Sequence, residues 1–546
     1  MTTSVQTAPT QIWPPEFAAR YRERGYWAGI SFGDLLRQLA AEHGERIAVV
    51  DGERRWSYAE LLTRAQAAAQ GYLSLGLAPG DRVVVQIPNV ADFFPAVFGL
   101  FLAGLVPVYA LPAHRQTELT HFVRRSGARA LVIMDRHEGF DYRPLAKDVQ
   151  AEVPELEHLI VIGDAGADVG FDGWRRADGV ELPDVDPSSV AFLQISGGST
   201  GLSKLIPRTH DDYIYSFRAS AEVSGITPDT VYLTALPVAH NFPMSSPGVF
   251  GVLSAGGQVV MCPNPRPETA FALIEKERVT ITGVVPPMAL RWMQAAPRTK
   301  HDLSSLRVLQ VGGAKFIPEA AARVRPTLGC TLQQVFGMAE GLVNYTRLDD
   351  PDETIVNTQG RPLSPDDEVL VLDDDGNPVP DGEAGHLLTR GPYTIRAYHN
   401  EPAANARSFT DDGFYRTGDI VKRLPGGYLS VQGRAGDHIN RAGEKVSAED
   451  IEDHLLAHPQ VHDAAVVSIP DPYLGERSCA FVIAAEGEAP GAADLKRFVR
   501  GRGVAVFKVP DQIVFVEGFA TTAVGKVSRN VLRAELRARF LKEGNA

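Results

Sequence analysis

Apolar residues along this chain follow two spacings, one typical of helices and the other of buried strands. Residues Phe32–His43 and Tyr58–Leu75 carry a helical pattern of apolar positions. Short apolar runs between and after them predict strands at Ile47–Val50, Arg82–Ile87, Ala130–Met134 and Leu159–Ile162. Because strands and helices alternate, the pattern predicts an α/β fold with largely parallel sheets covered by helices on both faces.

The segment Phe93–Leu111 has no charged residue over a length that could nearly span a bilayer. Prolines and glycines interrupt it, including Pro95, Gly104 and Pro107. We therefore expect a helix buried between sheet layers, followed by a strand that begins near Val106, and no membrane segment.

The pattern changes twice towards the C-terminus. Short apolar segments separated by Asp/Gly turns at Gly360–Gly391 predict a β-rich subdomain. After Gly433 the mixed pattern returns, with a helix expected at Ala448–Ala457 and a strand at Asp463–Ile469. We predict two domains: a large N-terminal domain, residues 1–435, and a small mobile α+β domain, residues 436–546, a size normal for an independent unit.

Composition limits the functional classes that the chain can belong to. It has 546 residues, of which 44% are hydrophobic and 22% charged, as in a globular protein of several domains. A net charge of −13 argues against a nucleic-acid partner. The N-terminus lacks the apolar core of a signal peptide. Three widely spaced cysteines, Cys262, Cys330 and Cys479, are expected to be buried in a reducing compartment, so we expect a cytoplasmic protein.

A Gly/Ser/Thr run that ends in lysine, Ser196–Lys204, follows an apolar segment expected to form a strand, Val190–Ile195. Glycines allow backbone N–H groups to approach a phosphate, and the hydroxyls and the lysine add further donors. It is not a Walker A loop, because the Gly-Lys-Ser/Thr ending is absent and Pro207 follows too closely for a helix. Taken alone, such a run is also typical of a flexible loop.

Two further motifs change this interpretation: Tyr-Arg-Thr-Gly-Asp at Tyr415–Asp419 and Thr-Ala-Val-Gly-Lys at Thr522–Lys526. Together the three motifs resemble those of the adenylate-forming superfamily, which includes acyl-CoA synthetases, luciferases and nonribosomal adenylation domains. The resemblance extends from about Trp13 to Lys542. It implies ATP and Mg²⁺ as cofactors: a carboxylate attacks the α-phosphorus and pyrophosphate departs, so the site needs donors, a lysine and a metal.

Within this resemblance, the loop suits the β- and γ-phosphates, and Glu340 is the expected Mg²⁺ ligand. The alternative for Glu340 is an acid that stabilises a helix N-terminus. Phe336 is expected beside the adenine. Asp419 can accept both ribose hydroxyls, and Arg434 is a second ribose or phosphate ligand. The candidate ATP-binding set is Ser196, Gly197, Gly198, Ser199, Thr200, Lys204, Gly313, Ala314, Val335, Phe336, Gly337, Met338, Asp419, Arg434 and Lys526.

Lys526 is the expected catalytic lysine, together with Glu340 and His240. A lone Gly-Lys is usually a surface turn, but in the superfamily this lysine bridges the acid and the α-phosphate during adenylation only. The small domain then rotates and the thioester forms. The resemblance places the hinge at Gly436, where relatives often have Asp or Lys, and glycine widens the allowed dihedral angles.

The segment His240–Gly248 looks like the signature of stand-alone aryl-acid AMP ligases, which activate salicylate or 2,3-dihydroxybenzoate for siderophore-type assembly. A plain Pro/Ser loop is the alternative. His240 and Asn241 are neutral polar groups that suit a substrate without an amine, and Asn241 can bond a 2-hydroxyl. The expected aryl-acid-binding residues are His240, Asn241, Phe242, Ser246, Gly313, Val335 and Val343.

The leading expectation is a two-step ligase that converts an aryl acid and ATP to aryl-AMP and then loads a separate aryl carrier protein. An aryl-CoA ligase differs only in its thiol acceptor and remains an alternative. A P-loop NTPase or a non-catalytic nucleotide-binding protein is a more remote one, which the missing Gly-Lys-Ser/Thr ending disfavours.

Overall fold

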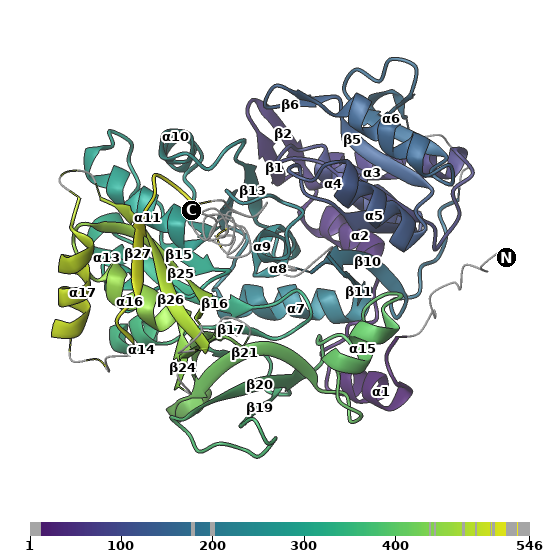
Figure 1. The fold of residues 1–546 in the computed structure, drawn as a ribbon. Coiled ribbons are helices and arrows are strands. Elements are labelled where there is room, and N and C mark those ends of the chain that lie inside the picture. The colour runs from purple at the N-terminus through teal and green to yellow at the C-terminus, as the bar shows by residue number, and fades with distance from the viewer. Residues whose placement is uncertain are drawn as a thin grey trace.

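The computed structural model describes residues 12–175, 181–196, 203–435, 438–441, 444–471, 475–485, 487, 489–502, 504, 508–519 and 532. Figure 1 shows two sheet-centred halves joined by α7, with a β-rich part below them and the C-terminal elements along one side. The fold is mixed α/β with a large N-terminal domain and a smaller C-terminal one, as the sequence predicts.

One half of the large domain holds a seven-stranded sheet. Its strands are parallel except β11, an edge strand antiparallel to β10. In spatial order they are β11 (Leu205–Thr209), β10 (Val190–Ile195), β4 (Val106–Tyr109), β3 (Arg82–Gln86), β5 (Ala130–Met134), β8 (His158–Ile162) and β9 (Val169–Gly170). Pro207 lies in this edge strand, where the missing N–H is tolerated.

The other half holds a nine-stranded sheet whose central six strands are parallel. The order is β18 (Arg361–Pro362), β17 (Val343–Tyr345), β16 (Thr331–Gly337), β15 (Val308–Gly312), β14 (Ile281–Val284), β12 (Val231–Thr234), β13 (Gln258–Met261), β1 (Ile47–Asp51) and β2 (Arg54–Ser57). The strands β17, β18 and β2 run antiparallel to their neighbours.

The uncharged segment is confirmed as a buried helix followed by a strand. All ten residues of α4 (Phe93–Leu102) are buried, and β4 begins at Val106. The helix packs in a large hydrophobic core with α2, α3 and strands of both sheets. Among the described residues, no helix combines the length and apolar character needed to cross a membrane.

Capping residues stabilise the first turn of two of the predicted helices. Ser31 and Asp34 form a capping box that starts α2, and Ser57 and Glu60 form another that starts α3. The helices of the large domain are α1 (Pro15–Glu23), α2 (Phe32–His43), α3 (Tyr58–Ser74), α4, α5 (Gln116–Ser126), α6 (Tyr142–Glu152), α7 (His210–Val223), α8 (Asn241–Ser245), α9 (Gly248–Ser254), α10 (Pro267–Glu277), α11 (Pro286–Ala295), α12 (Pro318–Ala321), α13 (Val324–Leu328), α14 (Asp352–Asn357) and α15 (Pro402–Ser408).

The β-rich subdomain is confirmed as an antiparallel sheet of β19 (Glu368–Leu372), β20 (Ala384–Arg390), β21 (Tyr415–Arg423) and β22 (Leu429–Arg434). Beyond it, a separate sheet contains β23 (His438–Arg441), β24 (Glu444–Ser447), β25 (Val461–Asp471), β26 (Gly475–Ala484) and β27 (Gln512–Phe515), with helices α16 (Ala448–Leu456) and α17 (Ala492–Gly501). This sheet has its own hydrophobic cores on its two faces.

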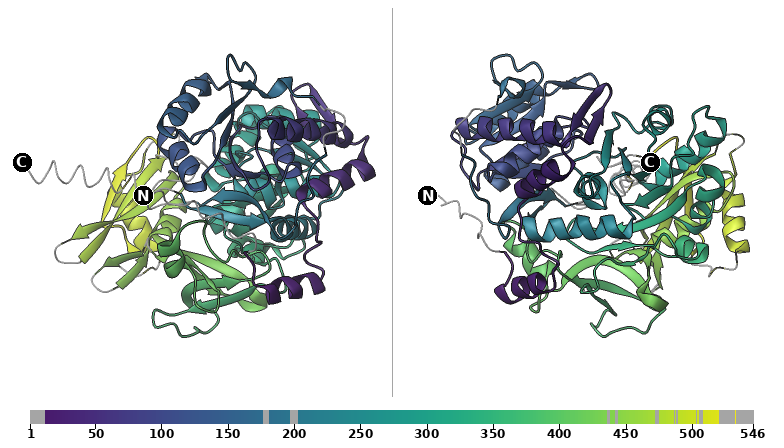
Figure 2. Two further views of the ribbon diagram at one scale, coloured as in Figure 1. Left: turned by 90° about the vertical axis from the view of Figure 1, so that its right-hand side faces the viewer. Right: turned by 180° about the vertical axis from the view of Figure 1, so that it is seen from behind.

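The C-terminal sheet lies beside the nine-stranded half, as both views from front and back show (Figures 1 and 2). An ion pair of 2.8 Å joins Lys315 to Asp453 in α16, and Arg502 pairs with Glu319 at 3.0 Å. Lys315 follows Ala314, one of the predicted ATP-binding residues. The small domain therefore contacts the large one next to the predicted nucleotide site.

Candidate active site

The predicted residues around the nine-stranded sheet gather at one edge of it. Gly313 and Ala314 follow β15, while Gly337 and Met338 lie at and after the end of β16. The two strands are parallel neighbours, with Gly312 opposite Val335. Since ligands of parallel α/β sheets bind beyond the carboxyl ends of the strands, this edge is a suitable place for one.

The end of the Phe242 ring lies close to the backbone of this sheet. A Cβ atom at Gly283 or at Gly312 would stand 3.2 Å from Cζ of Phe242, so a larger residue at either position would crowd the ring. Val335 of β16 and Val343 of β17 belong to the same buried cluster as Phe242. The structure thus brings together the three apolar residues predicted to hold an aryl ring.

Two polar residues lie at the start of α8. His240 caps this helix, and its Nδ1 accepts a hydrogen bond from the Phe242 N–H at 3.3 Å. Asn241 accepts a hydrogen bond at Oδ1 from the buried hydroxyl of Tyr213 at 2.8 Å. Because the Asn241 carbonyl accepts this bond, its Nδ2 can serve as a donor towards a ligand.

Ser246 ends the same short helix and is buried, with 3% of its surface exposed. Its hydroxyl lies close to that of Tyr345, whose pKa is raised by burial. The serine is therefore surrounded by protein, and a polar neighbour lies within reach of its hydroxyl.

Glu340 lies in the tight turn between β16 and β17, where Gly341 N–H donates to the Met338 carbonyl at 3.1 Å. It is not at a helix N-terminus, so the alternative interpretation of Glu340, an acid that stabilises a helix N-terminus, is wrong. Its side chain is almost buried, and Oε1 accepts a hydrogen bond of 2.9 Å from Tyr398.

One buried carboxylate suits a magnesium ion that takes its other ligands from phosphate and water. Within the described ranges, no three His, Cys, Asp or Glu residues cluster as a protein-only metal site would require. Glu340 therefore fits a metal that arrives with a nucleotide better than one held by the protein alone.

The two ends of the Ser196–Lys204 loop are joined in a hairpin. Ser196 N–H donates to the Lys204 carbonyl, and Lys204 N–H donates to Ser196 Oγ, both at 2.9 Å. Lys204 Nζ lies 4.3 Å from the ring centre of Tyr398, the residue that bonds Glu340. The loop thus ends beside the predicted metal ligand. Gly197, Gly198, Ser199 and Thr200 lie outside the described residues.

Asp419 and Arg434, the two predicted ribose ligands, are bonded to each other. They are opposite partners in β21 and β22, and Arg434 Nε lies 2.9 Å from Asp419 Oδ1. Burial raises the pKa of Asp419 to about 6, while the Arg434 charge acts in the opposite direction. Lys526 and Gly436 lie outside the described residues, so their predicted roles stay predictions.

Burial of the three cysteines is confirmed, and it raises the pKa of the Cys262 and Cys330 thiols to about 12. Such thiols are poor nucleophiles and play no part in the site.

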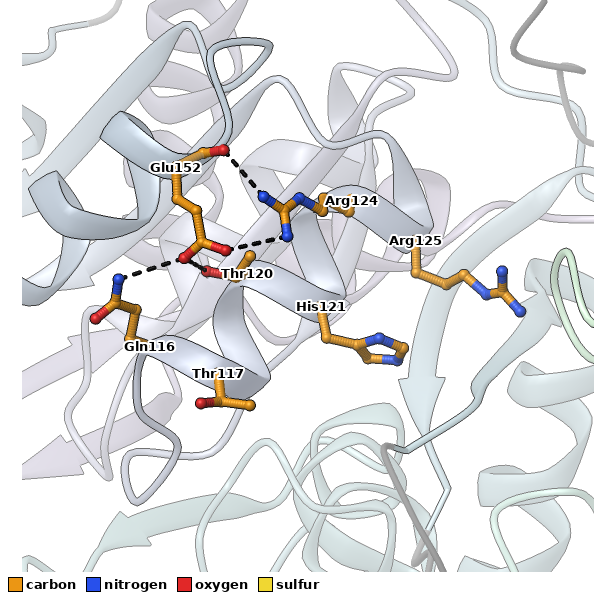
Figure 3. Close-up of a pocket in the computed structure, with 7 residues that line it drawn as sticks. All are labelled: Gln116, Thr117, Thr120, His121, Arg124, Arg125 and Glu152. Atoms are coloured by element: carbon orange, nitrogen blue, oxygen red, sulfur yellow. Dashed lines mark hydrogen bonds and ion pairs between the residues drawn. The ribbon is translucent and has the colours of Figure 1, made fainter. Parts of the chain in front are cut away.

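A surface pocket of about 630 Å³ lies apart from the predicted residues, over α5 (Figure 3). Arg124 and Glu152 lie side by side at one end of it and form an ion pair of 3.0 Å. Elsewhere in its lining, His121 Nε2 lies 3.0 Å from the Ser203 carbonyl oxygen. This contact links the pocket to the end of the loop.

Three residues that shape the site were not predicted: Tyr398, Tyr213 and Gly283. Each lies in a segment without a recognisable motif, and each acquires its role from a residue distant in the chain. No local pattern in the sequence could have identified them.

A Gly/Ser/Thr loop ends beside a buried carboxylate, and a buried apolar cluster lies on the sheet that carries this carboxylate. This is the arrangement expected of an adenylate-forming enzyme. The chain belongs to the AMP-binding enzyme family: residues 36–399 match the family, and residues 450–526 match the AMP-binding enzyme C-terminal domain.

Similar proteins narrow the comparison within this family. A 2,3-dihydroxybenzoate-AMP ligase of Bacillus subtilis is 59% identical over 97% of this chain and 98% of its own. A salicyl-AMP ligase / salicyl-S-ArCP synthetase of Mycobacterium tuberculosis is 46% identical over 96% and 94%. The apo structure of MbtA from Mycobacterium smegmatis has a TM-score of 0.75 and 48% identity, over 96% of this chain and 99% of that one.

Proposed function

We propose that this enzyme activates a 2-hydroxybenzoic-type acid, salicylate or 2,3-dihydroxybenzoate, as the acyl adenylate. The observation that carries the proposal is the buried apolar cluster that contains Phe242, Val335 and Val343, together with the Asn241 amide, whose carbonyl accepts from Tyr213. Such a combination suits a planar ring with a polar substituent next to its carboxylate. The names of the similar ligases, which act on such acids, support the same choice.

In the first step an oxygen of the acid's carboxylate attacks the α-phosphorus of ATP, and the bond to pyrophosphate breaks. We assign His240, which caps α8 next to Asn241, to the carboxylate of the acid. The loop and Lys204 bind the phosphates that leave. Asp419 accepts hydrogen bonds from the ribose hydroxyls, and its partner Arg434 is a second ligand of the ribose or a phosphate. Mg²⁺ bound at Glu340 would offset the charge of the phosphates.

In the second step a phosphopantetheine thiol attacks the acyl carbon and AMP departs. We propose that Lys526 stabilises the negative charge that develops on the α-phosphate in the first step. We place the pivot between the two steps at Gly436 and the domain boundary at residues 435–436. We propose an aryl carrier protein of siderophore biosynthesis as the acceptor and the cytoplasm as the compartment. These assignments rest on the motifs and on the names of the similar ligases.

Acid-dependent exchange of pyrophosphate into ATP tests the first step. Salicylate and 2,3-dihydroxybenzoate should support rapid exchange, 6-methylsalicylate slower exchange, and benzoate the slowest. Exchange with none of the four acids would contradict the proposal, and acid-independent release of phosphate would point to an NTPase. Mass analysis of products formed with a phosphopantetheinylated carrier protein or with CoA then identifies the acceptor.

A further inference from the structure

We propose that Tyr398 is a positioning residue that holds Glu340 and Lys204 in the arrangement that binds the metal–nucleotide complex. The inference rests on the proposed function, because it takes these two residues as ligands of the metal and the phosphates. Tyr398 lies outside the three sequence motifs, between β20 and α15.

The hydroxyl of Tyr398 orients the carboxylate of Glu340. It donates to Glu340 Oε1 at 2.9 Å and lies 3.0 Å from the hydroxyl of Tyr415 in β21. All three groups are at least nine-tenths buried, so water does not replace these bonds. Because Oε1 is held by the tyrosine, the direction in which Glu340 presents Oε2 is set by this contact.

The ring of Tyr398 has a different neighbour. Lys204 Nζ lies 4.3 Å from the ring centre, a distance at which the negative face of the ring attracts an ammonium group. The Tyr398 side chain therefore contacts both the ammonium group of Lys204, at the end of the loop, and the carboxylate of Glu340, in the β16–β17 turn. These two residues are far apart in the chain and lie next to strands of different sheets.

The backbone of Tyr398 is held firmly enough for this task. Asn405 in α15 accepts from the Tyr398 N–H at 2.8 Å and donates to its carbonyl at 3.0 Å. The next residue, His399, donates its N–H to the Leu205 carbonyl at the start of β11. The backbone beside Tyr398 is thus hydrogen-bonded to β11, the strand that follows the loop. Tyr398 therefore connects the end of the loop with the carboxylate of Glu340.

Core packing alone does not account for a tyrosine here. The ring packs edge-on against Phe409 and Tyr415, contacts that phenylalanine would make equally well. The hydroxyl adds only the polar contacts described above. Tyr398→Phe therefore removes the proposed role of the hydroxyl and keeps the packing.

The test compares Tyr398→Phe with Tyr72→Phe, which removes another buried hydroxyl, one that bonds the Ala96 carbonyl in the core. We expect Tyr398→Phe to raise the free Mg²⁺ needed for half-maximal pyrophosphate exchange about tenfold, as for the loss of one hydrogen bond to a charged group. The KM for the aryl acid should stay within twofold. Tyr398→Leu should in addition raise the KM for ATP, because Lys204 loses the ring. Tyr72→Phe should change none of these values.

A second readout does not depend on turnover. Binding of Mn²⁺ together with a non-hydrolysable ATP analogue, followed by electron paramagnetic resonance, should weaken in Tyr398→Phe and not in Tyr72→Phe. Equal Mn²⁺ binding in the two variants would overturn the inference, as would a wild-type enzyme that binds no such complex. If no aryl acid supports exchange, the proposed function fails, while the Mn²⁺ comparison still decides the role of Tyr398.

Discussion

The region predicted for the acid and the region predicted for the nucleotide are built in opposite ways. In the acid region Phe242, Val335 and Val343 pack as neutral surfaces against glycine backbone. In the nucleotide region the functional groups are charged and already have partners: Asp419 with Arg434, and Glu340 and Lys204 with Tyr398.

We expect this difference to decide how each region responds to its ligand. In the acid region a poorly fitting substrate should meet steric overlap. In the nucleotide region the charged groups should act where charge develops during the reaction. Substitutions should therefore have larger effects on the rate in the nucleotide region than in the acid region.

The largest effect is expected from Lys526→Ala. Loss of one preorganised contact to the α-phosphate should slow adenylation by about 10²–10³-fold. Thioester formation from supplied aryl-AMP should be largely spared, because we assign the lysine to the first step alone. Rapid-quench assays of the two half-reactions measure both rates, and equal losses would indicate a structural lysine.

A substitution of Asp367 tests whether the buried surroundings of the acid region favour uncharged side chains. It is buried beneath Tyr393, which donates to it at 2.6 Å and accepts from the Val343 N–H, and burial raises its pKa to about 7. Since the native state favours the protonated acid, this contribution is fully present below about pH 4 and is lost as the pH rises from there through 7. The part lost above pH 5 amounts to about 2 kcal/mol.

Asp367→Asn should therefore flatten the fall in stability between pH 5 and pH 8, as measured by urea unfolding. The exposed Asp375→Asn serves as the control. An unchanged slope in Asp367→Asn would show that Asp367 ionises normally.

Gly312→Ala tests the shape of the acid region directly. The new Cβ would lie 2.7 Å from the Val335 carbonyl oxygen and 3.2 Å from Phe242, so the apolar cluster must shift at a cost of about 1–3 kcal/mol. We expect kcat/KM for the aryl acid to fall, with the KM for ATP little changed. Gly173→Ala, whose Cβ would meet nothing within 4 Å, is the matched control. A loss shared equally by both substrates would mean that the two regions are not separate.

Asn241→Ala should weaken salicylate and 2,3-dihydroxybenzoate together by about 1 kcal/mol, the net value of one hydrogen bond. Their advantage over benzoate in pyrophosphate exchange should narrow accordingly, because the amide held by Tyr213 is lost. If benzoate already matches salicylate in the unmodified enzyme, the role given to Asn241 is wrong.

The smallest effect is expected from Ser246→Cys. The hydroxyl of Ser246 is buried near that of Tyr345, so a ring hydroxyl would not be the only polar group beside it. We expect a shift of preference towards salicylate of about 1 kcal/mol or less. Competition between the two acids in the exchange assay measures it, and a larger shift would make Ser246 a principal determinant of specificity.

The sequence by itself determined the elements and the chemistry that lies within single segments. The helix at Phe32–His43 matches its prediction residue for residue, and α4 is buried as its uncharged composition required. Such features are local, because periodicity and capping act over a few residues.

Only the tertiary structure decided which groups face one another across the chain. The sequence left open whether Glu340 stood at a helix N-terminus, and the fold places it in a turn under the hydroxyl of Tyr398. The contact of Phe242 with Gly283 and Gly312 likewise depends on how α8 lies over the sheet. Burial, pairing and direct contact arise from packing between distant segments, and no local pattern of residues encodes that packing.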